Sequence, residues 1–309
     1  MAVKELPFRK RYNRYMKKVL AIVGPTAVGK TDFGIRCANT FNGEIISGDS
    51  IQIYRGLDIG SAKPSKEERE KAIHHLIDIK SPKDNYSVKE FQERCRELID
   101  SISSDNKLPI IVGGTGLYIK ASLYDYVFFD EEKEDEQFED LSNEELYEML
   151  RSYDPKALEK IHINNRKRII RAINIYLKHE KGISMIKDEQ EHKPIYDSLI
   201  IGLTKERKEL FKQIDDRVDL MVQNGLVEEI KSLLDSGVTF SDQSMQGIGY
   251  KEFKDYFENN MSLEECIEKV KINSRHFAKR QYTFFNNQLD VKWFEDSDKA
   301  MQEVRQWLI

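Results

Sequence analysis

Short apolar runs alternate along this chain with longer stretches in which apolar positions recur at helical spacing. Four runs are typical of buried strands, at 19–23, 43–46, 108–112 and 197–203. Residues 31–40, between the first two runs, are predicted to form a helix. This alternation predicts an α/β protein with a mostly parallel sheet flanked by helices, in which 197–203 is the last strand.

Two regions are predicted to be almost entirely helical. The first is charged, with helices expected at Asn143–Ser152, Pro155–Ile161 and Asn165–His179. The second is the C-terminal third, whose helices pack back on the sheet and are expected at 206–224, 227–236, 250–258 and 262–288. The predicted organisation is a core domain of residues 1–123, a helical insertion of residues 124–186, and the remainder of the core in residues 187–309.

The first apolar run leads directly into a complete phosphate-loop motif. Its residues are Gly24, Pro25, Thr26, Ala27, Val28, Gly29, Lys30 and Thr31. A strand that turns into a helix at such a motif aims backbone N–H groups and the positive helix end at one anion. We therefore expect a diphosphate or triphosphate here, with Lys30 on its terminal phosphates and the Thr31 hydroxyl on Mg²⁺.

Polar residues follow the next two strands at the sheet edge where ligands bind in open α/β proteins. Asp49 and Ser50 follow the run at 43–46, and Gly113, Gly114 and Thr115 follow the run at 108–112. Asp49 is a candidate site residue, with capping of the following turn as the alternative. The glycines are expected to allow close approach of a ligand, beside the Thr115 hydroxyl.

Two absences argue against the hypothesis of an ordinary ATPase or GTPase. The run at 108–112 does not end in the acidic residue that would hold Mg²⁺ in a hydrolytic enzyme of this class, and no Asn-Lys-x-Asp guanine motif occurs.

Nine motifs together carry a family resemblance. They lie at 24–31, 47–50, 54–64, 112–118, 167–172, 217–218, 225–229, 246–252 and 278–281. In these motifs, and over residues 18–290, the chain closely resembles bacterial tRNA dimethylallyltransferases, also called tRNA isopentenylpyrophosphate transferases.

The resemblance implies a phosphate-loop NTPase-like fold with an inserted helical tRNA-binding domain. It implies transfer of a dimethylallyl group from dimethylallyl diphosphate to the N6 amine of the adenine 3′ of the anticodon in tRNA. It also implies a cytoplasmic, nucleotide-binding enzyme that uses Mg²⁺, binds the anticodon stem-loop and acts as a monomer.

Site residues follow from the same resemblance. Asp49 is expected to orient the adenine amine and accept its proton, with Thr115 near the bridging oxygen and Arg217 as a further cation on the diphosphate. For Arg217 the alternative is a surface ion pair with Asp215 or Asp216. The residues expected to contact tRNA are Asp49, Ser50, Ile51, Gln52, Thr115, Lys167, Arg168, Ile169, Ile170, Arg171, Gln246, Gly249, Lys279 and Arg280.

Charge distribution is compatible with RNA although the net charge of the 309-residue chain is −5. Residues 130–140 hold eight acids and one lysine, so the rest of the chain sums to +2. We expect that run to be a solvated loop facing away from phosphate, because carboxylates repel RNA. The first 18 residues are basic and are predicted to be a flexible arm.

Basic residues also mark the helices at 165–179 and 262–288. On the second they are interleaved with Phe277, Tyr282, Phe284 and Phe285, most of which we expect to be core. Basic groups that neutralise phosphate, beside rings that can stack on bases, suit an RNA loop.

Other features exclude several protein classes. No apolar stretch has membrane-spanning length and no secretory segment is present, so no membrane partner is expected. Cys37, Cys95 and Cys266 are scattered singly, which indicates reduced thiols in a cytosol and no zinc site.

Three rival functions stay open. An adenylate dimethylallyltransferase would use AMP with the same loop and Asp49, but would need neither the insertion nor two basic helices. A phosphate-loop kinase would use Asp49 as base and consume ATP. A non-catalytic RNA-binding protein would leave Lys30, Thr31, Asp49 and Thr115 unexplained.

Overall fold

The computed structural model describes residues 16–128, 136–189 and 192–309. Within them the chain forms two compact units, one of residues up to 124 together with 194–309, and one of residues 125–193. Most of the predicted basic arm and residues 129–135, which include part of the acidic run, lie outside the described residues. No helix in the described part of the chain has both the length and the apolarity to cross a membrane.

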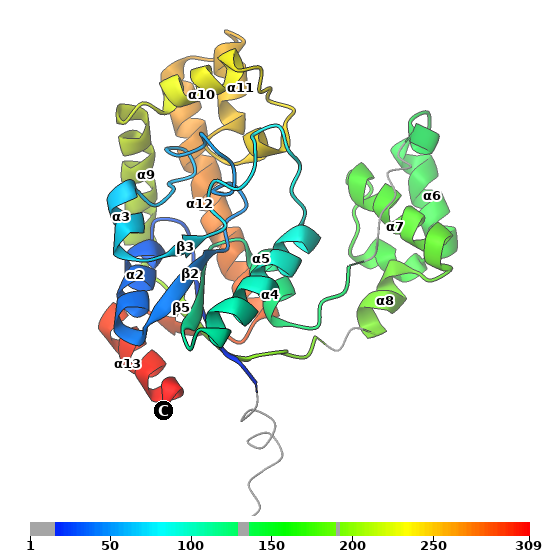
Figure 1. Ribbon diagram of the computed structural model, residues 1–309. Helices are drawn as coiled ribbons and strands as arrows, with labels where there is room; N and C mark the ends of the chain where they lie inside the picture. The colour runs from blue at the N-terminus through cyan, green and yellow to red at the C-terminus, as the bar shows by residue number, and fades with distance from the viewer. Residues whose placement is uncertain (1–15, 129–135, 190–191) are drawn as a thin grey trace, which may run out of the picture. The chain divides into compact units, whose positions relative to one another are not determined.

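A six-stranded parallel sheet forms the centre of the larger unit (Figure 1). Its order is β3-β2-β4-β1-β5-β6, with bounds His74–His75, Gly43–Ser47, Leu108–Val112, Lys18–Val23, Asp197–Leu203 and Lys292–Phe294. Leu20 of β1 pairs with Ile110 on one side and with Leu199 on the other. The predicted α/β fold with a parallel sheet is confirmed.

Two of the six strands escaped prediction. β3 has two residues and β6 has three, so neither forms a recognisable apolar run. They form strands because their backbone pairs with that of Ile45 in β2 and of Ile201 in β5. The expectation that 197–203 is the last strand is therefore wrong, since β6 follows it at the sheet edge.

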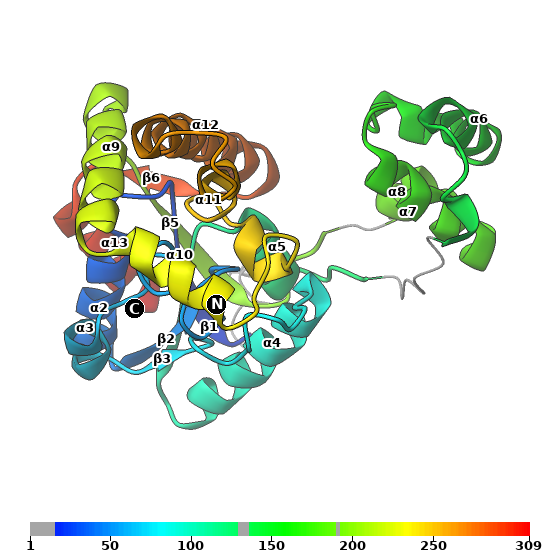
Figure 2. The ribbon, with the colours of Figure 1, turned by 90° about the horizontal axis from the view of Figure 1, so that it is seen from above.

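Helices cover both faces of the sheet, and Figure 2 shows α2 and α13 on one side and α4 and α5 on the other. Alternate residues of β1 supply the two cores, with Val19, Ala21 and Val23 on the α4 and α5 face and Leu20 and Ile22 on the opposite face. The helices of the unit are α2 Lys30–Phe41, α3 Lys66–Lys71, α4 Val88–Ser104, α5 Gly116–Leu123, α9 Arg207–Gln223, α10 Leu226–Asp235, α11 Lys254–Phe257, α12 Leu263–Gln288 and α13 Ser297–Leu308. Two single 3₁₀ turns, η4 and η5, occupy Gln243–Gln246 and Lys251–Phe253.

The smaller unit has a core of its own. It contains α6 Asn143–Tyr153, α7 Arg166–His179 and α8 Ile183–Glu189, with 3₁₀ turns η2 at Glu136–Phe138 and η3 at Pro155–Glu159. The buried Asp154 accepts a hydrogen bond from the Ser184 amide at 2.8 Å, which ties α8 to η3. The unit thus extends to Lys193, beyond the expected boundary at 186.

Two residues expected to contact tRNA on α7 are core residues instead. Ile169 and Ile170 are buried in the apolar cluster of the smaller unit, so their side chains are not available to RNA. Arg166, at the start of α7, donates to the Leu141 and Phe138 carbonyls and is a structural residue. Lys167, Arg168 and Arg171 are exposed on the same helix.

The ends of β2 and β4, which lead into the site, are in direct backbone contact. Gly48, after β2, donates its N–H to the Val112 carbonyl at the end of β4. A Cβ at Gly113 would lie 2.3 Å from the Gly48 oxygen. The sequence predicted that this glycine allows close approach of a ligand. In the structure it also allows β2 and β4 to end side by side.

We predict that Gly113→Ala destabilises the protein by about 1 to 3 kcal/mol, because backbone must move to admit the methyl group. Gly48→Ala is the matched control, since its Cβ would meet side-chain atoms of Ile119 and Ile111 at 3.0 and 3.3 Å and would lie no closer to backbone than 3.6 Å, from Gly113 Cα. Urea unfolding of the two variants measures the difference. Equal stability losses would contradict the packing argument.

Candidate active site

The phosphate loop has the geometry that anion binding requires. β1 ends at Val23, and α2 begins at Lys30 with Gly29 as its N-cap. No side chain caps this helix, so its first N–H groups are open to a ligand. The sequence motif therefore folds as predicted, at the carboxyl edge of the central strand.

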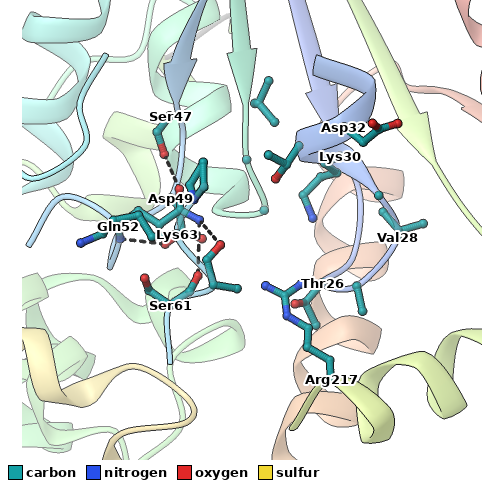
Figure 3. Close-up of a pocket in the computed structure, with 18 of the residues that line it drawn as sticks. Thr26, Val28, Lys30, Asp32, Ser47, Asp49, Gln52, Ser61, Lys63 and Arg217 are labelled. Atoms are coloured by element: carbon teal, nitrogen blue, oxygen red, sulfur yellow. Dashed lines mark hydrogen bonds between the residues drawn. The ribbon is translucent and has the colours of Figure 1, made fainter. Parts of the chain in front are cut away.

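A cavity of about 910 Å³ opens over this loop. Residues Thr26 to Thr31 line one wall, whereas Gly24 and Pro25 are not among the lining residues. Figure 3 shows Ser47, Asp49, Gln52 and Ser61 on the opposite wall, with Lys30 and Arg217 pointing into the space between. Lys30 and Arg217 thus face Asp49 across the cavity. The whole lining contains four cationic side chains, Lys30, Lys63, Lys205 and Arg217, and four carboxylates, Asp32, Asp49, Glu68 and Asp216.

The surroundings of Lys30 favour the binding of an anion. Its ammonium group donates to the Pro25 carbonyl at 2.6 Å. Burial, reinforced by the positive charge of Arg217, lowers the pKa of Lys30 to about 7, while Asp49 acts in the opposite direction. A phosphate bound between the two cations would offset both unfavourable effects.

Arg217 is not held in the surface ion pair that the sequence left open. Asp215 binds Arg275 at 2.7 Å and Asp216 binds Lys212 at 2.6 Å. Among the described residues Arg217 makes no hydrogen bond or ion pair, and burial lowers its pKa. Its guanidinium therefore faces the cavity with its donors unused.

Asp49 caps the following turn, which was one of the two roles predicted for it, and the other role stays a prediction. Its Oδ1 accepts hydrogen bonds from the backbone N–H groups of Ile51 at 2.8 Å and Gln52 at 3.4 Å, which caps the turn. Its Oδ2 accepts no hydrogen bond from any described residue. One oxygen fixes the carboxylate and the other stays open to a ligand.

A second cavity of about 450 Å³ adjoins the first. Its lining includes the apolar side chains of Ile51, Ile214, Val218, Met221 and Val270. Thr26, Asp49, Ser61, Arg217 and Phe277 line both cavities. An anion in the first cavity and a flat or apolar group in the second can therefore meet at Asp49 and Arg217.

The structure brings most of the predicted site residues to these cavities. The second cavity is also lined by Ser50, Thr115, Gln246, Gly249 and Arg280. Thr31 lines the first cavity at the start of α2, where its hydroxyl can share a cation with a bound diphosphate. Lys279 lines neither cavity and lies in an open groove along α12 with Arg280.

Gln52 has its side chain committed within the protein. Its Oε1 accepts from the Ser47 hydroxyl at 3.0 Å, and its amide nitrogen donates to the Ser61 and Ala62 carbonyls. It ties the end of β2 to the 61–62 loop and lines the first cavity. Its observed hydrogen bonds thus serve to position the wall.

Glu229 and Tyr250 hold the same wall from the other side. The Glu229 carboxylate accepts hydrogen bonds from the amides of residues 58, 59 and 60, and from the Tyr250 hydroxyl at 2.8 Å. That hydroxyl accepts from the Ser61 amide. Both residues lie in motifs noted in the sequence, but about 170 positions separate Glu229 from the loop it binds, so no local signal assigned their roles.

Three of the four aromatic residues singled out on α12 belong to the core, as expected for most of them. Phe285 is fully buried, and Tyr282 and Phe284 pack against the two apolar clusters. Phe277 lines both cavities and stacks under the Arg280 guanidinium at 5.6 Å.

Comparison with known proteins identifies close relatives. The family model described as IPP transferase matches residues 52–288. A protein of Anoxybacillus flavithermus called tRNA dimethylallyltransferase is 48% identical over 292 residues, which is 94% of each chain, and one of Bacillus mycoides is 49% identical over 298 residues, again 94% of each.

Solved structures agree with the sequence matches. The tRNA isopentenylpyrophosphate transferase of Staphylococcus epidermidis superposes with a TM-score of 0.71 at 42% identity, covering 94% of this chain and 98% of that one. A eukaryotic dimethylallyltransferase solved in snapshots of its action on tRNA superposes with a TM-score of 0.84 at 29% identity, covering 94% of this chain and 79% of that one.

We predict that Arg217→Gln weakens the binding of inorganic diphosphate in the presence of Mg²⁺ by roughly 10-fold to 100-fold, the loss expected for a charged hydrogen bond. Titration calorimetry measures the affinity. Lys212→Gln on the same helix is the control, because Lys212 is exposed and pairs with Asp216. Unchanged diphosphate affinity in the Arg217 variant would place the anion elsewhere.

Proposed function

The chain belongs to the IPP transferase family and is a transferase that modifies tRNA, and we propose that it prenylates the adenine 3′ of the anticodon. The dimethylallyl group would come from dimethylallyl diphosphate and go to the exocyclic N6 amine, with release of diphosphate. One observation carries this proposal. A cavity built on the phosphate loop, into which Lys30 and Arg217 point, and a second, partly apolar cavity have Asp49 and Arg217 in common.

The cavity over the phosphate loop suits the leaving group. An allylic C–O bond breaks when the charge that develops on the departing diphosphate is stabilised. The first N–H groups of α2, Lys30 and Arg217 surround the space where that charge would form. Thr115 lines the second cavity. In the proposed complex its hydroxyl would lie near the oxygen that bridges the allyl carbon and the diphosphate.

We propose Mg²⁺ as the metal cofactor, with the Thr31 hydroxyl as the protein ligand. When bound, the metal would neutralise part of the diphosphate charge. It would need few protein ligands because phosphate oxygens and water usually complete its octahedral shell.

Asp49 suits the role of base toward the adenine amine. The lone pair of that amine is delocalised into the ring, so the amine attacks well only when it is oriented and loses its proton as the C–N bond forms. The open Oδ2 of Asp49 can accept that proton, while Oδ1 holds the carboxylate in place. The electron pair of the broken C–O bond leaves with diphosphate, which balances the reaction.

The walls of the second cavity suit an extruded base. An adenine of the anticodon loop is normally stacked and must leave the stack to react, at a cost of a few kcal/mol. Ser50, Ile51, Gln246 and Gly249 line the cavity that would receive it, and the ring of Phe277 offers a surface for contact. The substrate would be the anticodon stem-loop of tRNA.

Phosphate contacts would come from exposed basic side chains. Lys167, Arg168 and Arg171 on α7 and Lys279 and Arg280 on α12 are candidates, since each is exposed. We propose that the smaller unit, through α7, contributes to tRNA binding. We further propose that the enzyme acts as a monomer in the cytoplasm, where its tRNA substrate is found.

Labelled dimethylallyl diphosphate with Mg²⁺ and either an unmodified anticodon stem-loop or AMP tests the proposal. We expect transfer to the stem-loop and none to AMP. Transfer to AMP alone would favour the adenylate dimethylallyltransferase reading. Turnover of ATP without prenyl transfer would favour the kinase reading.

We predict that Asp49→Asn lowers the rate of transfer by about 10² to 10⁴ with little change in tRNA affinity, because asparagine keeps the oxygen that caps the turn but cannot take the proton. Single-turnover transfer to the stem-loop measures the rate, and filter binding measures the affinity.

Asp84→Asn is the matched control for this prediction. Asp84 also caps a turn, by accepting from the Ser81 amide at 2.8 Å, and it lines neither cavity. Transfer by the Asp49 variant at the rate of the Asp84 variant would remove Asp49 from the chemistry.

We also predict that Lys167→Gln or Arg168→Gln weakens tRNA binding and lowers the slope of log affinity against log salt by about 1, the effect of losing one phosphate contact. Affinity measured between low and moderate salt gives the slope. Lys299→Gln, at an exposed position on α13, is the control. Slopes that stay equal to that of the wild type would exclude α7 from the RNA surface.

A further inference from the structure

Gln281 is a buried side chain whose motif was noted in the sequence but whose role was not assigned. It lies on α12 with 6% of its surface exposed. Its Oε1 accepts a hydrogen bond from the Thr26 amide at 3.1 Å, and its Nε2 donates to the Gly114 carbonyl at 3.0 Å. One amide group thus links three segments that are far apart in the sequence.

Each of these segments carries a part of the site. Thr26 belongs to the phosphate loop, and Gly114 immediately precedes Thr115. Phe277 and Arg280, which line the second cavity, stand on α12 within one turn of Gln281. The Thr26 amide is already engaged by Gln281, so the side chain acts on the shape of the loop and leaves phosphate binding to the N–H groups at the start of α2.

The glycine at 114 is explained by the same contact. A Cβ at this position would lie 2.2 Å from Gln281 Nε2. Gly114 makes room for the Gln281 amide and also lines the first cavity, so close approach of a ligand to this glycine stays a prediction. The sequence around Thr115 is therefore adapted to Gln281.

We propose that Gln281 is a positioning residue that sets the distance between the diphosphate cradle, the Thr115 hydroxyl and the α12 wall of the acceptor cavity. This inference rests on the proposed prenyl transfer. Transfer requires the allyl carbon to meet the amine in line with the departing diphosphate, and a misplacement of about 1 Å can cost about 10²-fold in rate. Gln281 lines the first cavity, but both polar atoms of its side chain are engaged by the backbone of Thr26 and Gly114, so it acts on kcat through the segments it joins.

Gln281→Met tests the proposal, because methionine keeps the length of the side chain and removes both hydrogen bonds. We expect kcat for transfer to the stem-loop to fall roughly 10-fold to 100-fold. The affinity for inorganic diphosphate with Mg²⁺, measured by calorimetry, should stay within about 3-fold of the wild type. A kcat close to that of the wild type, or an equal loss in both quantities, would overturn the proposal.

Gln92→Met is the matched control for a merely structural effect. Gln92 is also a buried glutamine, 7% exposed, and donates to the Ala121 carbonyl at 2.7 Å, but it lines neither cavity. We expect its variant to lower the melting temperature and to keep kcat. A loss of kcat in the control as large as that in Gln281→Met would mean that loss of any buried amide has this effect.

Gly114→Ala provides a second variant, which keeps Gln281 and displaces its amide. We expect the same pattern of lowered kcat and retained diphosphate affinity. Combining it with Gln281→Met should give little further loss of kcat, because both changes disrupt the same contact between Gln281 and Gly114. Fully additive losses, or a Gly114 variant with the kcat of the wild type, would refute the link.

Transfer by the wild type is measured first. Its absence would refute the proposed function, whereas a working wild type with unaffected variants would refute only the role of Gln281.

Discussion

The candidate site depends on two cations, Lys30 and Arg217, that face one cavity. Burial removes water from Lys30, and the charge of Arg217 adds to the cost of its protonation, so that its pKa falls to about 7. The neighbouring carboxylates of α9 are engaged by Lys212 and Arg275 and leave Arg217 free to act on the cavity. A ligand with a dense negative charge, such as a diphosphate, matches this arrangement, and the rest of the site is organised around the place where that charge would lie.

Hydrogen-bonding side chains from distant elements hold the walls of this space. Gln52 ties the end of β2 to the 61–62 loop, Glu229 and Tyr250 hold the 58–61 loop, and Gln281 joins the phosphate loop to the backbone before Thr115. Each makes at least one hydrogen bond to a backbone group, which keeps buried amides satisfied and limits movement of the loops. The reacting groups therefore stand on loops whose ends are fixed, as precise alignment of two reactants requires.

Prediction from sequence succeeded where the signal was local. The apolar runs of β1, β2, β4 and β5 and the periodicity of α7, α9 and α12 each lie within one segment, and the observed bounds agree with the expected ones to within a few residues. β3 and β6 were missed because two or three residues form a strand only when a neighbour offers its backbone. Ile169 and Ile170 were expected at the RNA surface because they lie in a family motif, but the helix turns them into the core of the smaller unit.

The candidate anion site could be located from the sequence alone, because eight contiguous residues between a strand and a helix contain both the backbone donors and the lysine that such a site needs. The sequence also determined the α/β class, since that follows from the order of periodic segments. Three features became visible only once the chain was folded: Arg217 faces the cavity, one oxygen of Asp49 stays open, and Gln281 joins the two loops. These outcomes depend on contacts between residues as far as 255 positions apart, and such contacts leave no pattern in any one stretch of sequence.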